Sequence, residues 1–326
     1  MNKSVSFYPM SFKKNLIPKI WGGKKLEYFF SYQSLEKNYG ESWEISVIKG
    51  FESIVNNGVL KNKKLDKLIE KYPIEILGEK VYDKYGLNFP LLIKFIDVNK
   101  PLSIQVHPND ETAKVRHNSF GKNEMWYIIE AEKNAKLSLG FSQKMNKKIF
   151  YKNLKDKTID KVLNSYKVKP KDAFYVSAGT VHALKGKMLL LEVQQSSDIT
   201  YRIYDYNRLD PKTGKKRELH KKSAITSINF SAKKNEKIKY NSNVNKINAI
   251  VENNFFKVYY LKVNGKEIRK IFMHGSFWIL VCLEGLLSVH HENKKYLLKK
   301  GKILLIPAIV NLINIEGHGE IICVTT

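Results

Sequence analysis

The sequence predicts a mainly β protein with two jelly-roll barrels and a small helical insertion in its N-terminal part. Three observations predict this fold class: many short apolar runs bounded by glycine and proline turns, only two clear stretches of helical periodicity, and an internal repeat. The 326 residues are enough for two moderate domains. We expect a first domain at residues 1–235 and a second at residues 236–326.

Helical periodicity is expected at residues 60–77 and at residues 144–166. In the first stretch, leucines and isoleucines recur among lysines, and Pro73 interrupts the pattern before it resumes. The second stretch has apolar residues at mixed helical spacing. Both are interpreted as insertions between β segments. A polar stretch from Lys221 to about Asn245 predicts an exposed connection between the domains.

Four possible metal ligands lie on three β-rich segments of the first domain. Gln105 and His107 share one face of a strand, because side chains at i and i+2 point to the same side. Glu124 begins a second apolar strand, 17 residues after His107. His182 follows a third strand and a turn at Gly179, which can place its imidazole beside the other three groups.

Two imidazoles, one carboxylate and one amide suit a catalytic metal site. Zinc and its neighbours accept mixed nitrogen and oxygen ligands, and a catalytic site leaves one coordination position for water or substrate. A neutral Gln and a single Glu leave a divalent site at about +1, which favours an anion developing nearby. The alternative is that each residue is an ordinary strand residue. That alternative suits either His alone better than it suits the four residues together.

Five motifs, in order, resemble the type I phosphomannose isomerases (mannose-6-phosphate isomerases), specifically their short bacterial branch of cupin-fold proteins. The matching segments are Trp21-Gly22-Gly23, Ser103-Ile104-Gln105-Val106-His107-Pro108, Gly121-Lys122-Asn123-Glu124, Ala178-Gly179-Thr180-Val181-His182 and Tyr201-Arg202-Ile203-Tyr204-Asp205-Tyr206-Asn207-Arg208. Each motif is weak alone, but their order and spacing cover most of the chain. Long-form members carry His-Lys-Pro-Glu where this chain has Gly121 to Glu124, so that extra His has no counterpart here.

The resemblance implies a metal-dependent aldose–ketose isomerase that interconverts D-mannose 6-phosphate and D-fructose 6-phosphate through an enediolate. It carries the ligand roles onto Gln105, His107, Glu124 and His182, with one Zn²⁺ per chain as the usual ion. It also makes Arg202 the catalytic arginine.

Such a reaction needs a base at carbon, a proton shuttle at oxygen and a cation for the oxyanion. We expect Arg202 to be the electrostatic stabiliser and Asp198 to help open the sugar ring. Glu192 and Lys122 both occupy active-site positions of the family that the chain resembles, and either could remove the carbon-bound proton. Each would need a shifted pKa: Glu raised by burial, or Lys lowered by the nearby metal. The sequence slightly favours Glu192, whose alternative role is to orient a metal ligand.

The substrate phosphate has three candidate contacts, Ser103, Lys122 and Arg208, among which spacing does not choose. The alternative for Arg208 is a surface ion pair with Asp205 or Asp210.

Two other classes of function stay open. A non-catalytic sugar-binding cupin, regulatory or for storage, would keep the fold but lack some acid–base residues, whereas this chain has Glu192, Asp198 and Arg202. An iron-dependent cupin oxygenase usually needs more imidazole than two His and has little use for a Gln ligand. Neither accounts for the Arg202 segment as well as an isomerase does.

The second domain is expected to be a degenerate cupin-like β domain without a metal site. Strands are predicted at residues 255–263, 277–283, 286–290, 295–299 and 303–306. Residues 171–179 align with residues 301–309, which places Leu312 where the first domain has His182. Only the first domain is therefore expected to be catalytic.

The net charge of +26 would ordinarily suggest nucleic-acid binding. Only five of the 57 basic residues are Arg, however, and the lysines are scattered without a recognition motif. We expect a small sugar phosphate as partner and no nucleic acid or membrane. The positive field would raise encounter rates with that substrate. We expect a monomer or a weak homodimer.

The two cysteines, Cys282 and Cys323, lie in apolar strands, so we expect buried thiols and neither a disulfide framework nor a thiolate zinc site. The N-terminal residues lack the apolar core of a signal peptide, and no apolar run has the roughly 18 residues that a membrane span needs. We therefore expect a cytoplasmic protein.

Overall fold

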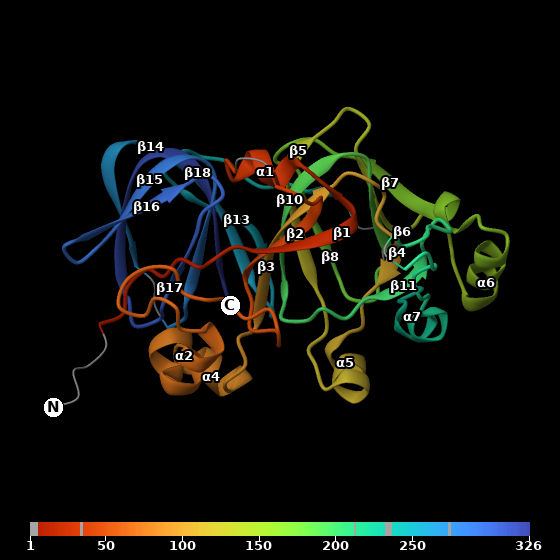
Figure 1. Cartoon of the computed structure of the whole chain (residues 1–326), viewed down its shortest axis with the longest axis horizontal. Coiled ribbons are helices and arrows are strands. Elements are labelled where there is room, and N and C mark those ends of the chain that lie inside the picture. Colours follow the sequence, from red (N-terminus) through yellow and green to blue (C-terminus); the bar gives the residue numbers. More distant parts are fainter. Residues whose placement is uncertain (1–5, 33–34, 212, 232–236, 273–274) are drawn as a thin grey trace. The chain divides into compact units, whose positions relative to one another are not determined.

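The computed structural model describes residues 6–32, 35–211, 213–231, 237–272 and 275–326, without the side chains of 266–272. The fold is mainly β, as predicted, and its strands form three antiparallel sheets (Figure 1). The chain divides into two compact units, one of residues 1–15, 43–92 and 239–326 and the other of residues 16–42 and 93–238. The predicted domain boundary between residues 235 and 236 lies outside the described residues.

Two of the sheets position the candidate site. The seven-stranded sheet has the order β1 (Asn15–Gly23), β2 (Tyr39–Ile45), β3 (Leu91–Val98), β10 (Met188–Gln195), β5 (Glu124–Ala131), β8 (Ala173–Val176) and β12 (Lys237–Ile238). The five-stranded sheet has the order β11 (Tyr201–Tyr204), β4 (Ile104–Val106), β9 (His182–Lys185), β6 (Lys136–Phe141) and β7 (Leu163–Lys167).

A shared apolar core joins these two sheets. Trp126 and Leu190 of the seven-stranded sheet cluster with Leu137 and Leu184 of the five-stranded sheet. The opposite face of the five-stranded sheet packs in a second cluster with α6 (Lys147–Lys155), the 3₁₀ helix η1 (Ile159–Val162) and α7 (Lys221–Ser227). The five-stranded sheet is thus buried on both faces, and only its inner face meets the other sheet.

The helix predictions are partly right. Residues 60–77 contain α2 (Leu65–Lys71) and α3 (Pro73–Leu77), with Pro73 at the first position of α3, and α4 (Glu79–Tyr85) follows. Residues 144–166 contain α6 and η1, but the prediction is wrong at its end, because Tyr166 lies in β7 opposite Leu137 of β6. Pairing with β6 makes the end of this segment a strand and not a helix.

The polar stretch from Lys221 is not a plain connection either. It begins with α7, which buries Ala224 and Ile225 against the five-stranded sheet. The remaining helices are α1 (Lys25–Phe29) and α5 (Asp110–His117). Among the described residues, no helix is long and apolar enough to cross a membrane.

The third sheet contains the C-terminal strands. They are β13 (Ile247–Glu252), β14 (Lys257–Phe272), β15 (Trp278–His291), β16 (Lys294–Lys299), β17 (Ile303–Ile306) and β18 (Leu312–Thr325). The two strands predicted at 277–283 and 286–290 form the single strand β15, which has a register shift between Cys282 and Glu284. β17 and the start of β18 follow β8 and the start of β9 at a constant offset of 130 residues. Leu312 therefore stands where the repeat predicts it.

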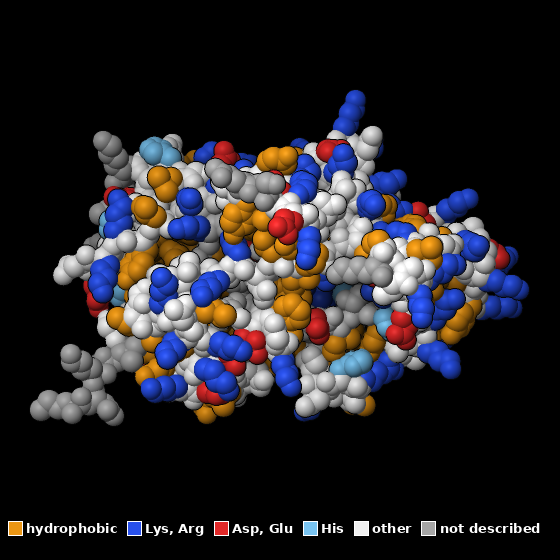
Figure 2. Space-filling model, in the orientation of Figure 1, with side chains coloured by type: hydrophobic (Ala, Val, Ile, Leu, Met, Phe, Trp, Pro, Cys, Tyr) orange, Lys and Arg blue, Asp and Glu red, His pale blue; other side chains and the backbone are white. Residues whose placement is uncertain are grey.

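Both cysteines are buried free thiols, as predicted. Burial raises the pKa of Cys282 and of Cys323 to about 12. Figure 2 shows lysine and arginine side chains spread over the visible face with acidic side chains among them.

Candidate metal centre and active site

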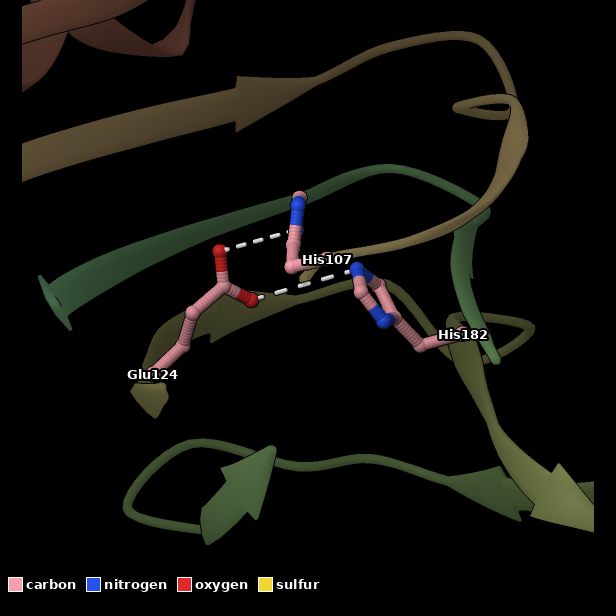
Figure 3. Close-up of side chains that lie close together, drawn as sticks. All are labelled: His107, Glu124 and His182. Atoms are coloured by element: carbon pink, nitrogen blue, oxygen red, sulfur yellow. Dashed lines mark ion pairs between the residues drawn. The ribbon is translucent and has the colours of Figure 1, made fainter. Parts of the chain in front are cut away.

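Three of the four predicted ligands come together in the structure. His107, Glu124 and His182 are buried, and one ligand atom from each lies within 4.8 Å of the others. Glu124 Oε1 lies 3.2 Å from His107 Nε2, and Glu124 Oε2 lies 3.9 Å from His182 Nε2 (Figure 3). The carboxylate thus faces both imidazoles from the opposite sheet.

Strand register explains the part of the site on the five-stranded sheet. Ile104 and Val106 of β4 pack in the cluster with α6, η1 and α7 on the outer face of the sheet. Gln105, which lies between them, therefore points to the inner face. Gln105 lies opposite His182 of β9 and opposite Arg202 of β11. Residues directly opposite one another share a face, so these three polar residues form one row across three strands.

Backbone hydrogen bonds fix both imidazole rings. The Nδ1 atom of His107 lies 2.8 Å from the carbonyl oxygen of Ile199, and that of His182 lies 2.9 Å from the carbonyl oxygen of Thr180. A carbonyl only accepts, so each Nδ1 carries the proton and each Nε2 keeps its lone pair. The lone pairs point toward the carboxylate of Glu124.

Both imidazoles are held neutral. Burial, followed by the charge of Lys122, lowers the pKa of His107 well below its usual value. Burial lowers the pKa of His182 to about 4, against a smaller opposing effect of its hydrogen bond to Thr180. Neutral imidazoles with free Nε2 atoms are the form that binds a metal ion.

Gln105 lies at the same site with its amide nitrogen toward His182. Its Nε2 atom is 3.2 Å from His182 Nε2, and its Oε1 accepts a hydrogen bond from Ser103 at 3.3 Å. Ser103, a predicted phosphate contact, and Gln105, a predicted metal ligand, therefore both lie beside the cluster.

A buried network of charges adjoins the cluster on the seven-stranded sheet. Lys122 Nζ contacts Glu124 Oε1 and lies 3.4 Å from His107 Nε2 and 4.0 Å from Glu192 Oε1. Glu192 Oε1 also lies 3.3 Å from Lys94 Nζ, and its Oε2 accepts a 2.8 Å hydrogen bond from the Trp126 indole. Both oxygens of Glu192 are therefore engaged.

This network shifts two pKa values. Burial lowers the pKa of Lys122 to about 7, although the Glu192 charge opposes the shift. Burial alone would raise the pKa of Glu192, but the charges of Lys122 and Lys94 and the Trp126 hydrogen bond hold it low, at about 2. The direction for Glu192 is opposite to the one its predicted role as a base requires.

Lys94 and Trp126 were missed by the motif analysis. Lys94 is the one ionisable residue besides Asp97 in β3, a strand that is buried throughout. A charged side chain inside an otherwise apolar strand is the signal that could have identified Lys94, because such a charge needs a partner. Trp126 carries no comparable signal, since an aromatic residue is expected in a strand.

The predicted arginines are bound to groups outside the cluster. Arg202 is half-buried, and its guanidinium donates a 2.9 Å hydrogen bond to the Glu218 carbonyl. Burial, followed by the charge of Arg217, lowers the pKa of Arg202. Arg208 pairs with Asp205, one of the two surface partners considered from the sequence.

Asp205 also accepts two hydrogen bonds from Arg217, at 2.8 and 2.6 Å. These contacts hold the pKa of Asp205 below its usual value although its burial acts in the other direction. Asp198 is exposed in the loop after β10, one residue before the carbonyl that fixes the His107 ring.

The donor set fits a divalent metal ion. Three acceptor atoms converge, because both Nε2 atoms carry lone pairs and Glu124 is a carboxylate. Glu124 Oε2 is also buried and has no hydrogen-bond partner among the residues that the structure describes. Buried acceptors that converge need a cation or donors among them, and here Lys122 and the Gln105 amide nitrogen supply them. Imidazole nitrogen with carboxylate oxygen is also a ligand mixture that zinc accepts.

Family comparisons place this site in context. Residues 10–150 match the model of the phosphomannose isomerase type I catalytic domain, and residues 246–326 match the mannose-6-phosphate isomerase cupin domain. The first range contains His107 and Glu124, whereas His182 lies between the two ranges.

Individual relatives match over nearly the whole chain. The probable mannose-6-phosphate isomerase GmuF of Bacillus subtilis is 34% identical over 96% of this chain and 98% of its own length. The mannose-6-phosphate isomerase of Streptococcus mutans is 33% identical over 96% and 97%. The crystal structure of the mannose 6-phosphate isomerase from Bacillus subtilis matches with a TM-score of 0.88 and 34% identity, covering 97% of this chain and 99% of that one.

Proposed function

Because this chain belongs to the type I phosphomannose isomerases, we propose that it interconverts D-mannose 6-phosphate and D-fructose 6-phosphate. The observation that carries this proposal is the buried cluster of His107, Glu124 and His182 beside the charged pair Lys122 and Glu192. An aldose–ketose isomerase needs a cationic centre and a nearby base, and both requirements are met by groups in this one region.

We propose that His107, Glu124 and His182 hold a Zn²⁺ ion, with Gln105 as a fourth ligand. Gln105 would ligate through its amide oxygen, which requires that the amide turn around from its present contact with His182. A bound zinc ion supplies Lewis acidity toward the substrate oxygens.

Lys122 is our candidate for the base that moves the proton between C1 and C2. Its Nζ lies among Glu124, His107 and Glu192, at the edge of the cluster. Glu192 is the weaker candidate because Lys94 and Trp126 occupy both of its oxygens. We assign Glu192 instead to holding Lys122 in place.

Arg202 is proposed to stabilise the enediolate oxygen, because it lies in the same cross-strand row as Gln105. Asp198 would help to open the sugar ring, as an exposed carboxylate beside the Ile199 carbonyl that orients His107. The role of Arg202 is implied by the family resemblance, and that of Asp198 is our own expectation from its position.

Ser103 is the better candidate for the substrate phosphate, because Lys122 is assigned above to proton transfer. Ser103 lies beside the cluster, where it donates to Gln105. Arg208 would have to leave Asp205 and the Pro101 carbonyl before it could bind phosphate.

The proposal is tested by formation of fructose 6-phosphate from mannose 6-phosphate by the purified protein, assayed as isolated, after chelation, and after zinc is restored. We expect turnover that is lost on chelation and returns with zinc, and little turnover with glucose 6-phosphate as comparator. A metal-loaded protein without turnover would contradict the proposal and favour a sugar-binding cupin.

A further inference from the structure

The segment between Lys122 and Glu124 is held by one buried asparagine. We propose that Asn123, clamped by Gln195, is a positioning residue that fixes Lys122 and Glu124 for the proposed isomerase reaction, on which this inference rests. Asn123 is 6% exposed and Gln195 is 4% exposed. Lys122 and Glu124 contact each other in the site, whereas the side chain of Asn123 between them forms hydrogen bonds with Gln195, Tyr175 and Ala178.

Asn123 uses both ends of its amide and both of its backbone polar groups. Its backbone N–H and its Nδ2 donate to Gln195 Oε1 at 3.0 and 2.7 Å, and its carbonyl accepts from the Gln195 N–H at 3.2 Å. Its Oδ1 accepts from the Tyr175 hydroxyl at 3.1 Å and from the Ala178 N–H at 2.9 Å. The side chain therefore joins β10, β8 and the turn that leads into His182.

Gln195 extends the clamp to the segment that carries His107. Its Nε2 donates to Asp110 Oδ1 at 2.9 Å, and the same oxygen accepts from the Gly121 N–H at 2.7 Å. Asp110 is the first residue of α5 and follows His107 by three positions. Lys122 N–H donates to the Pro108 carbonyl at 3.1 Å.

These hydrogen bonds connect the three segments that carry His107, Glu124 and His182, and all of them are formed between groups of the protein itself. The His107 carbonyl also accepts from the Gly179 N–H at 2.9 Å, in the turn before His182. The Gln195 amide has one orientation that serves both neighbours, since it must accept from Asn123 and donate to Asp110. Asn123 and Gln195 are buried, whereas Asp110 at the end of the network is exposed. Breaking a bond between the buried amides leaves their partners unpaired.

Small displacements at such a site have large consequences. Outer hydrogen bonds that orient metal ligands typically change metal affinity or activity by about 10- to 100-fold when they are removed. A misplacement of about 1 Å can cost about 100-fold in rate. We assign no contact with the substrate or with the metal cluster to Asn123, so its effect on the reaction comes through the positions of Lys122 and Glu124.

The test compares Asn123→Ala with a matched control, Asn248→Ala. Asn248 is also a 6% exposed asparagine, and its amide donates to the carbonyls of Asn243 and Tyr260 and accepts from the Asn243 N–H, far along the chain from the candidate ligands. Three quantities are measured for each protein: kcat per bound metal, KM, and the rate at which a chelator removes Co²⁺. The visible absorption of bound Co²⁺ reports ligand geometry.

We expect Asn123→Ala to lower kcat per bound metal by about 10- to 100-fold with KM changed by less than about threefold. Co²⁺ should leave about 10-fold faster, and its visible spectrum should change. Asn248→Ala should leave all these values within about twofold of wild type. An Asn123→Ala protein that only melts earlier, with kcat per bound metal and the Co²⁺ spectrum unchanged, would overturn the proposal.

Gln195→Met provides a second variant, in case Asn123→Ala does not fold. It keeps a side chain of similar length and removes all three hydrogen bonds of the Gln195 amide. It should show the same fall in kcat, and normal kcat per bound metal in this variant would also overturn the proposal. If wild type itself lacked isomerase activity, the proposed function would fail, but the Co²⁺ release rate and spectrum would still decide whether the clamp positions the ligands.

Discussion

Replacing Lys94 with Met should destabilise the folded protein by about 3 kcal/mol, because it leaves the buried Glu192 carboxylate with a single nearby cation. Lys94 Nζ lies 3.3 Å from Glu192 Oε1, and Lys122 Nζ lies 4.0 Å from it. Lys94 and Glu192 are 5% and 4% exposed, so water screens their attraction only weakly.

The magnitude follows from these distances. At an effective dielectric constant of about 20, an ion pair at this separation is worth roughly 5 kcal/mol of Coulomb attraction. Removing Lys94 also removes the cost of burying its ammonium group, which offsets part of the loss. The remaining contacts of Glu192 with Lys122 and Trp126 keep the net change near the lower end of the range of about 3–5 kcal/mol for breaking a buried pair.

The assay is a double-mutant cycle of urea unfolding at pH 7, followed by tryptophan fluorescence on metal-free protein. Glu192→Gln is the second substitution, because the amide oxygen can still accept from the Trp126 indole. The double variant should be more stable than the sum of the single losses predicts, by about 3 kcal/mol. Additivity within about 0.5 kcal/mol would refute the ion-pair argument.

Three further predictions follow from the same structure. His182→Ala should remove most bound metal, whereas Arg202→Ala should retain it and lose turnover, as metal analysis and the isomerase assay would show; near wild-type activity of Arg202→Ala would contradict its proposed role. Burial raises the pKa of Cys282 and Cys323 from 9.0 to about 12, so both thiols stay protonated as the pH rises through 9. A thiol reagent at pH 8 should therefore label the folded protein roughly 1,000-fold more slowly than the unfolded protein. Equal labelling rates would show that the thiols are accessible. Gly121→Ala should lower both stability and activity, because an added Cβ would lie 2.5 Å from the Asp110 nitrogen, and a normal unfolding midpoint would mean that α5 gives way at little cost.

Much of the fold could be predicted from the sequence, because many strands are apolar runs bounded by glycine and proline turns. The repeat is an example: β8 and β17 occupy aligned positions, and the same number of residues leads from each to the next strand. The residues 163–166 could not be assigned by periodicity, because their pairing with β6 is a contact between segments that local spacing does not report. The same limit applies to β15, which continues through a register shift where the pattern predicted two separate strands.

The candidate ligands could be predicted because each lies in a recognisable motif. His107, Glu124 and His182 come together in the structure, although His107 follows the end of β4 and is not part of the strand on which it was predicted. The pKa of Glu192 could not be predicted, since its sign depends on Lys94 and Trp126, which reach it from two other strands. Likewise, nothing in the local sequence shows that Gln195 would clamp Asn123 across 72 residues.

We propose that one metal ion at the His107, Glu124 and His182 cluster supports the isomerase reaction. Titrating the chelated protein with Zn²⁺ while fructose 6-phosphate formation is followed, in wild type and in Glu124→Gln, tests this proposal. Wild-type activity should rise in proportion to added zinc and level off at about one equivalent per chain, while Glu124→Gln should need a large excess or stay inactive. Full turnover by the chelated protein, or an unchanged titration in Glu124→Gln, would contradict it.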